Sequence, residues 1–200
     1  MKHSQNIQEV VNSSLDLMGF IHYPKSKRYV GEDFVVPESI QSNVNIKSVA
    51  VMVNQPIEDV LINEKFQQYD LLQLHGDESP EYCGKLKNAG YNTIKAFGIN
   101  SSFDFEILKK YESVVDYFLF DTKSDQYGGT GMQFSWEVLD KYKLDKPYFL
   151  SGGISPENIA QIGQINIRPY CIDINSKFEI EPGLKDANLV SKAIDQIKTL

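Results

Sequence analysis

The sequence has few cysteines, no long apolar run and no excess of positive charge. Its only cysteines, Cys83 and Cys171, lie far apart without metal-ligand spacing, so free thiols are expected rather than a disulfide framework or a metal site. No apolar run approaches the length of a membrane span, and no apolar core follows the charged first residues as in a signal peptide. With 27 acidic and 20 basic residues, the formal net charge of −7 argues against a nucleic-acid-binding surface. We therefore expect a cytoplasmic protein that binds neither membrane nor nucleic acid.

Linkers rich in proline or glycine and low-complexity segments are also absent. Nothing in the composition therefore divides the chain into separate parts. A length of 200 residues is enough for one sizeable buried core. We expect a single domain over residues 1–200.

Short apolar runs alternate with helical patterns seven times along the chain. The expected strands are 17–23, 47–54, 70–75, 92–97, 117–121, 147–151 and 170–174. The expected helices are 4–13, 37–41, 56–66, 80–90, 102–111, 135–141, one from 155 and one from 186. This alternation predicts an α/β fold with a parallel sheet, and repeats of roughly 25–30 residues favour a closed (β/α)8 TIM barrel. Such a barrel has eight strands, so either the sheet is open or a first strand is missing from this chain.

The stretch from Tyr117 to Gly131 has the strongest chemical signal. An apolar strand ends on Asp121, and three glycines follow between 128 and 131. A carboxylate at a strand end can lose solvent yet still reach a ligand, as a general acid with a raised pKa requires. The glycines favour a loop that approaches a ligand closely or moves over it. By itself the tetrapeptide Phe-Asp-Thr-Lys favours an ordinary strand whose Asp starts a turn, and it is the repetition of the pattern along the chain that favours a site.

Two loops near the C-terminus have the features of a phosphate site. Gly152 and Gly153 lead into an expected helix start at Ser155, whose backbone amides would face a phosphate. Asn175 and Ser176 follow the last expected strand, and barrels commonly hold phosphate in the loops after their last two strands. The alternative is that the glycine pair forms only a tight turn.

Other polar residues lie where a parallel barrel would place its ligand. Arg28 offers a guanidinium fork to a carboxylate or phosphate, although a solvated loop charge explains it equally well. His75 and Asp173 lie at the carboxyl ends of expected strands and are candidate substrate-binding residues, but a strand-end histidine is more often structural. Cys83 on an outer helix and Cys171 at the start of a strand are not plausible nucleophiles or bases.

Several short motifs follow one another along the chain from residue 4 onward. They are Gly19-Phe-Ile, Tyr23-Pro-Lys-Ser-Lys-Arg-Tyr-Val30, Leu72-Gln-Leu-His-Gly-Asp-Glu-Ser79, Ile94-Lys-Ala96, Asp121-Thr-Lys with Gly128-Gly-Thr-Gly131, Phe134-Ser-Trp136, Ser151-Gly-Gly-Ile-Ser-Pro-Glu-Asn158, Asp173-Ile-Asn-Ser176 and Pro182-Gly-Leu-Lys-Asp186. Together they resemble the phosphoribosylanthranilate isomerases of tryptophan biosynthesis.

The resemblance implies a (β/α)8 barrel that needs neither cofactor nor metal. Its members convert N-(5-phosphoribosyl)anthranilate, a small phosphosugar substrate, to 1-(carboxyphenylamino)-1-deoxyribulose 5-phosphate by an Amadori rearrangement. By resemblance, Asp121 is the general acid and Arg28 holds the anthranilate carboxylate. The backbone around four residues would hold the phosphate: Gly152, Gly153, Asn175 and Ser176.

The chain departs from the family pattern at three places. Family members begin with a strand of the type Lys-Ile-Cys-Gly, whose cysteine is the general base, and neither strand nor cysteine is found before Ser4. We expect Met1 to be an internal methionine of a longer protein, and the chain by itself to be poorly active. Lys177 replaces a usual glycine, and Met132 replaces a usual lysine.

Two other functions fit parts of the sequence. A non-catalytic phosphosugar-binding barrel would keep the phosphate loops and lack the base. A relative of indole-glycerol-phosphate synthase is disfavoured by the pairing of Asp121 with the following glycines and by the lack of a catalytic lysine set. The sequence does not distinguish a monomer from a homodimer.

Overall fold

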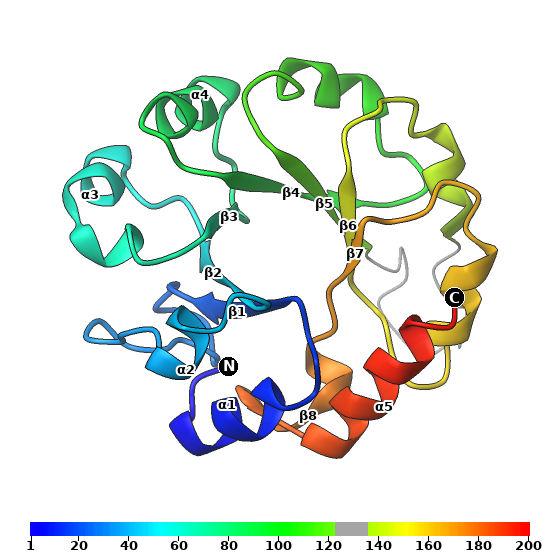
Figure 1. The fold of residues 1–200 in the computed structure, drawn as a ribbon. Helices are drawn as coiled ribbons and strands as arrows, with labels where there is room; N and C mark the ends of the chain where they lie inside the picture. Colours follow the sequence, from blue (N-terminus) through cyan, green and yellow to red (C-terminus); the bar gives the residue numbers. More distant parts are fainter. Residues whose placement is uncertain (123–135) are drawn as a thin grey trace.

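A parallel sheet that curves into most of a barrel is the centre of the molecule (Figure 1). The computed structural model describes residues 1–122 and 136–200, and within them seven strands form one parallel sheet whose order follows the chain from β1 to β7. The strands are β1 (Leu17–Ile21), β2 (Lys47–Met52), β3 (Leu71–Leu74), β4 (Thr93–Ile99), β5 (Tyr117–Thr122), β6 (Tyr148–Ser151) and β7 (Cys171–Ile172). The expected TIM-barrel class with seven identifiable strands is confirmed.

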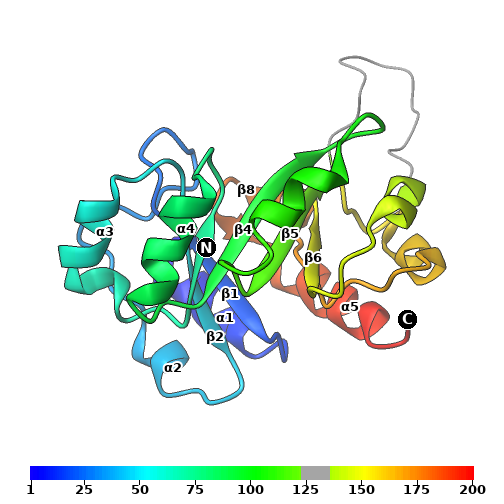
Figure 2. The same cartoon turned by 90° about the horizontal axis from the view of Figure 1, so that it is seen from above.

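Helices cover the outside of this sheet, as Figure 2 also shows. The α-helices are α1 (Ser4–Val11), α2 (Glu38–Gln41), α3 (Ile57–Ile62), α4 (Pro80–Asn88) and α5 (Ala187–Ile197). The 3-10 helices are Glu64–Phe66, Phe105–Lys110, Trp136–Lys141, Ile159–Gln164 and Ser176–Phe178. The expected helices at 102–111, 135–141 and from 155 are therefore present as shorter 3-10 helices, in which the hydrogen bonds join residues three apart.

Two further expectations needed correction. The expected helix over 56–66 breaks at Asn63, which is extended (φ −89°, ψ 104°) and whose side chain accepts a hydrogen bond from Lys65 N. The last parallel strand covers only Cys171–Ile172 rather than 170–174. A hairpin of β8 (Glu179–Glu181) and β9 (Leu184–Lys185) follows and was not predicted; Gly183 lies at its turn with φ +91°.

Side chains alternate between the two faces of the strands. The inner face contributes a small cluster inside the barrel: Val49, Leu71, Ile94, Ala96, Leu119 and Phe149. The outer face contributes the main core beneath the helices, including Phe118 and Phe120. Lys95, between two inward residues, therefore belongs to the helix-facing side.

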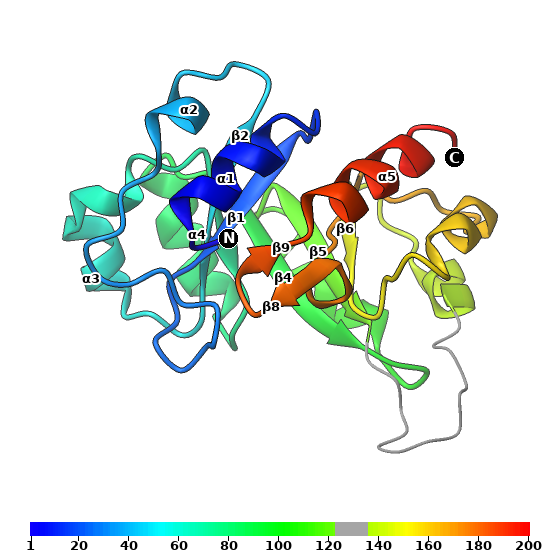
Figure 3. The same ribbon diagram turned by 90° about the horizontal axis from the view of Figure 1, so that it is seen from below.

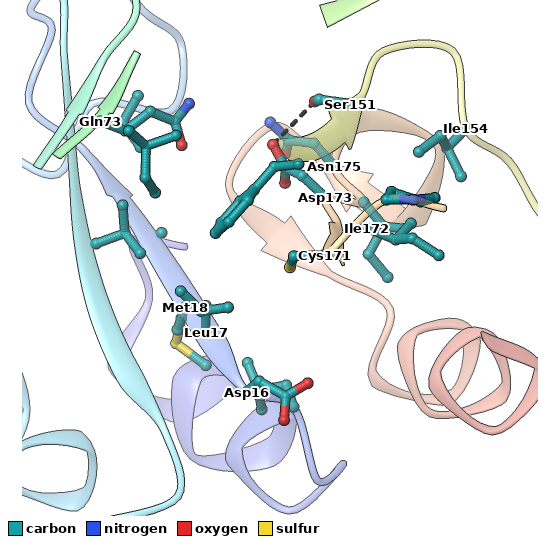
Figure 4. Close-up of a pocket in the computed structure, with 18 of the residues that line it drawn as sticks. Asp16, Leu17, Met18, Gln73, Ser151, Ile154, Cys171, Ile172, Asp173 and Asn175 are labelled. Carbon is teal, nitrogen blue, oxygen red and sulfur yellow. Dashed lines mark hydrogen bonds between the residues drawn. The ribbon is translucent and has the colours of Figure 1, made fainter. Parts of the chain in front are cut away.

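The sheet is open between its first and last strands. In the described part of the chain β1 and β7 pair with β2 and β6 respectively, and not with each other. Outside the sheet, α1 and α5 pack against one another (Figure 3). The opening joins a cavity of about 1070 Å³. Figure 4 shows Leu17 and Met18 across this cavity from Cys171 and Ile172. Of the two possibilities that the strand count allowed, an open sheet is what the described residues form.

No helix in residues 1–122 and 136–200 is long and apolar enough to cross a membrane.

Candidate active site

The carboxyl ends of the strands bring Asp121 and His75 together. Asp121 lies in β5, in register with Ser151 of β6, and His75 directly follows β3. The distance from His75 Nε2 to Asp121 Oδ2 is 3.5 Å. The Gln73 amide nitrogen lies 2.9 Å from His75 Nδ1 and can only donate, so a neutral His75 carries its proton on Nε2. His75 therefore directs an N–H toward the Asp121 carboxylate.

A buried ion pair fixes the loop that carries His75. Glu78 accepts hydrogen bonds from Asn54 N at 2.8 Å and from Gly76 N at 3.0 Å. Lys95 Nζ lies 3.2 Å from the same carboxylate, and the two side chains are only 2% and 1% exposed. Lys95 also donates to the backbone carbonyls of Leu74 and Gly76, so both buried charges are well partnered. This network holds the end of β3 in place.

Ser151 and Asp173 form a second polar pair in the cavity (Figure 4). The Ser151 hydroxyl donates to Asp173 Oδ2 at 2.9 Å, and the Asp173 amide donates to Leu150 O at 2.8 Å. Burial raises the pKa of Asp173, while its bond from Ser151 and the charge of Lys185 oppose that rise. The charge of Asp121 raises it further.

The two predicted phosphate loops line the same cavity as Asp121. Gly152 and Gly153 have φ of +85° and +65°, a region that residues with a Cβ rarely adopt. The Asn158 side chain accepts from Ser155 N and donates to Gly153 O, both at 2.8 Å, and so fixes this loop. The expected helix does not start at Ser155. A 3-10 helix begins at Ile159 instead. No helix N-terminus therefore lies at Ser155, contrary to expectation, and the candidate phosphate loop is a glycine-rich turn.

Asn175 and Ser176 form the other loop, directly after β7. Asn175 precedes the 3-10 helix that begins at Ser176. Lys185 Nζ donates to the Asn175 carbonyl at 3.0 Å and to its side-chain oxygen at 2.6 Å. The position of this loop therefore depends on the β8–β9 hairpin, which carries Lys185.

Arg28 lines the cavity from the loop after β1 and pairs with Glu179 of the hairpin. Its Nη2 lies 2.6 Å from Glu179 Oε2. Sequence reasoning missed Glu179, and it noted Lys185 only as part of a motif. The available signal was a pair of charged residues six positions apart around a proline and glycine turn.

Neither cysteine is set up for chemistry. Cys83 is fully buried, and burial raises its pKa to about 12. Cys171 lines the cavity at the amino end of β7, and burial raises its pKa to about 12 as well. Both thiols are protonated at neutral pH.

Some predicted features fall outside the described residues. They are the glycines at 128, 129 and 131, Met132 and residues 134–135 of the Phe-Ser-Trp motif. Among the residues that are described, no cluster of three or more His, Cys, Asp or Glu side chains is placed to hold a metal ion.

Comparisons with known proteins agree with this arrangement. The sequence model of the N-(5'phosphoribosyl)anthranilate (PRA) isomerase family matches residues 1–196. The PRA isomerase of Parabacteroides distasonis is 45% identical over 199 residues, which cover 98% of this chain and 90% of that protein.

Solved structures show the same similarity. The crystal structure of the Thermotoga maritima PRA isomerase has a TM-score of 0.81 and 32% identity, covering 100% of this chain and 96% of that one. A PRA isomerase in complex with reduced 1-(o-carboxyphenylamino)-1-deoxyribulose 5-phosphate has a TM-score of 0.77 and 29% identity, with the same coverage. The chain thus belongs to the N-(5'-phosphoribosyl)anthranilate isomerase family, the isomerases of tryptophan biosynthesis.

Proposed function

We propose that the cavity binds N-(5'-phosphoribosyl)anthranilate and that Asp121 is the general acid of its isomerisation. The observation that supports this most is the convergence of Asp121, Asp173 and both candidate phosphate loops on one cavity at the strand ends. A structural neighbour in complex with the reduced product supports a phosphosugar ligand of this kind. The non-catalytic phosphosugar-binding alternative is not favoured by the family.

The ligand has an anionic group at each end, and the cavity offers a matching polar residue for each. Gly152, Gly153, Asn175 and Ser176 would hold the phosphate through their loops, and Arg28 would hold the anthranilate carboxylate. Asp173, with its raised pKa, would donate to or accept from a ribose hydroxyl. The reacting sugar carbons would then lie between the two anchors, near Asp121.

The chemistry begins with proton transfer. Asp121 gives its proton to the ribose ring oxygen, the bond from C1′ to that oxygen breaks, and the nitrogen lone pair forms the Schiff base. A base then removes the C2′ proton to give the enolamine, which tautomerises to the ketone. We assign His75 the task of orienting Asp121 rather than the role of base, because its Nδ1 lone pair already accepts the Gln73 hydrogen bond. The resemblance assigns the base to a cysteine on a Lys-Ile-Cys-Gly strand.

The test is steady-state turnover of freshly generated substrate, followed by loss of its fluorescence. The 200-residue chain is compared with a version that carries a Lys-Ile-Cys-Gly strand ahead of Met1. In the more active version we expect Asp121→Asn to lower kcat by about 10²–10⁴, as loss of a positioned acid does. Asp77→Asn, an exposed aspartate two residues after His75, is the matched control and should leave kcat unchanged.

The outcomes separate the possible functions. An unchanged kcat in Asp121→Asn would remove this residue from the acid role. Binding of the reduced product without turnover in either version, with the fold intact, would favour the phosphosugar-binding protein.

We further propose that residues 1–200 act as one barrel domain in the cytoplasm, as a monomer or a homodimer. Light scattering of the purified chain distinguishes the two assemblies.

A further inference from the structure

An ionic network that joins the β8–β9 hairpin to the loop after β1 is built around Glu179. The Glu179 side chain is only 4% exposed. It accepts hydrogen bonds from Arg28, from Lys185 Nζ at 3.0 Å and from Gly183 N at 3.1 Å. Burial opposes its negative charge, but the hydrogen bonds from Arg28 and Lys185 outweigh burial and lower the pKa of Glu179 to about 2. Glu179 is therefore a fixed anion at every physiological pH.

Glu179 occupies one side of the Arg28 guanidinium and leaves another side available. Arg28 Nε lies 3.0 and 2.9 Å from the two carboxylate oxygens, and Nη2 lies 2.6 Å from one of them. Among the described residues, Arg28 Nη1 makes no hydrogen bond. The guanidinium is planar and its donors have a fixed geometry, so the Nε side held by Glu179 sets the direction of the Nη1–Nη2 edge. That edge can donate two hydrogen bonds to a second carboxylate, in the bidentate manner typical of arginine.

Lys185 connects the same network to the candidate phosphate loop. Its Nζ donates to Glu179 and also to the carbonyl and side-chain oxygens of Asn175. Burial lowers the pKa of Lys185, and the charge of Glu179 counteracts that effect. One buried lysine thus fixes the position of Asn175 relative to the carboxylate that holds Arg28.

The charges of the network also favour an anionic ligand. Arg28 and Lys185 carry two positive charges, and Glu179 carries one negative charge. Asp173, which lines the same cavity as Arg28, also interacts electrostatically with Lys185. The cation that faces a ligand carboxylate directly is therefore Arg28.

We propose that Glu179 is a positioning residue for recognition of the ligand carboxylate: it orients Arg28 and, through Lys185, sets the distance between the carboxylate end and the phosphate end of the site. This inference rests on the proposed role of Arg28 and extends it to two residues for which the family resemblance implied no role.

The experiment compares two ligands that differ in one group. They are reduced 1-(o-carboxyphenylamino)-1-deoxyribulose 5-phosphate and the same compound without the carboxyl group, with binding measured by calorimetry, so no turnover is needed. We expect Glu179→Gln to weaken binding of the carboxylated ligand by about 10–100-fold, because it loses a charge-assisted orientation of Arg28. Binding of the ligand without the carboxyl group should weaken by a clearly smaller factor, because Glu179 affects that ligand only through the contact of Lys185 with Asn175. Glu181→Gln, on the same hairpin but exposed, is the matched control and should affect neither ligand.

Two further variants keep the inference falsifiable. Glu179→Asp retains the charge and should restore part of the preference for the carboxylated ligand. If circular dichroism shows that Glu179→Gln does not fold, the preference measured in Glu179→Asp tests the inference instead. Equal loss of both ligands in the Glu179 variants would indicate a merely structural role and overturn the inference. Arg28→Met tests the proposed role of Arg28 separately from the role of Glu179. If this variant weakens binding of both ligands equally, Arg28 does not bind the carboxylate at all.

Discussion

The buried side chain of His22 should make the folded protein less stable in mild acid, and this effect can be assigned to that one side chain. The residue is 5% exposed and packs against the rings of Phe66 and Tyr69 at 5.5 and 5.3 Å. Its Nε2 lies 2.7 Å from the Tyr69 hydroxyl, and its Nδ1 is buried without a hydrogen-bond partner among the described residues. Burial, with a smaller contribution from Lys65, lowers the pKa of His22 from 6.5 to about 4.

The direction and the size of this stability change follow from the linkage between protonation and unfolding. The folded state keeps His22 neutral below its ordinary pKa, whereas the unfolded chain takes up a proton as the pH falls through 6.5. The unfolded state therefore gains stability relative to the folded state between pH 6.5 and the folded pKa of about 4. At pH 5 the folded state should have lost about 2 kcal/mol of the stability that it has at pH 7.5, from this group alone.

The assay is urea denaturation at pH 7.5 and at pH 5.0 for the parent chain and for His22→Asn. The variant loses packing at both pH values. The difference between its free energies of unfolding at pH 7.5 and pH 5.0 should, however, be about 2 kcal/mol smaller than the same difference in the parent. Other titrating groups, such as Asp173 and Glu179, are common to both proteins and cancel in the difference. His3→Asn, at an exposed position, should retain the full pH dependence. An equal pH dependence in His22→Asn and the parent would refute the reasoning.

Two predictions concern the loop that carries His75. A Cβ at Gly76 would lie 2.3 Å from a neighbouring amide oxygen and 2.8 Å from a backbone nitrogen, so Gly76→Ala should lower the free energy of unfolding by about 1–3 kcal/mol. An unchanged denaturation midpoint would show that the loop moves aside freely. Lys95→Met would leave Glu78 buried without its cation, and we expect a loss of about 3–5 kcal/mol in the same assay. Lys85→Met breaks an exposed pair instead and should cost less than about 1 kcal/mol, so equal losses in the two lysine variants would contradict the assigned burial.

The candidate site was only partly predictable from the sequence. Asp121 and the glycine pair at 152 and 153 could be named as candidates because strand ends and glycines have local sequence signals. Glu179 was missed because its main partner, Arg28, is 151 positions away in the chain, and no local pattern indicates such a pair. The raised pKa of Asp173 depends on its burial and on neighbours from other strands, which the sequence does not display.

The sequence by itself determined the order of the seven parallel strands and of the helices that alternate with them. Apolar runs of strand length, caps such as Ser79 and the alternation of side chains are local properties, and they persist in the folded protein. Only the tertiary structure decided whether short connections became α- or 3-10 helices, where the hairpin of β8 and β9 lies, and which buried charges meet. Those outcomes depend on the distance each segment must span and on partners distant in the chain, since a buried charge is stable only where its counter-charge is also buried.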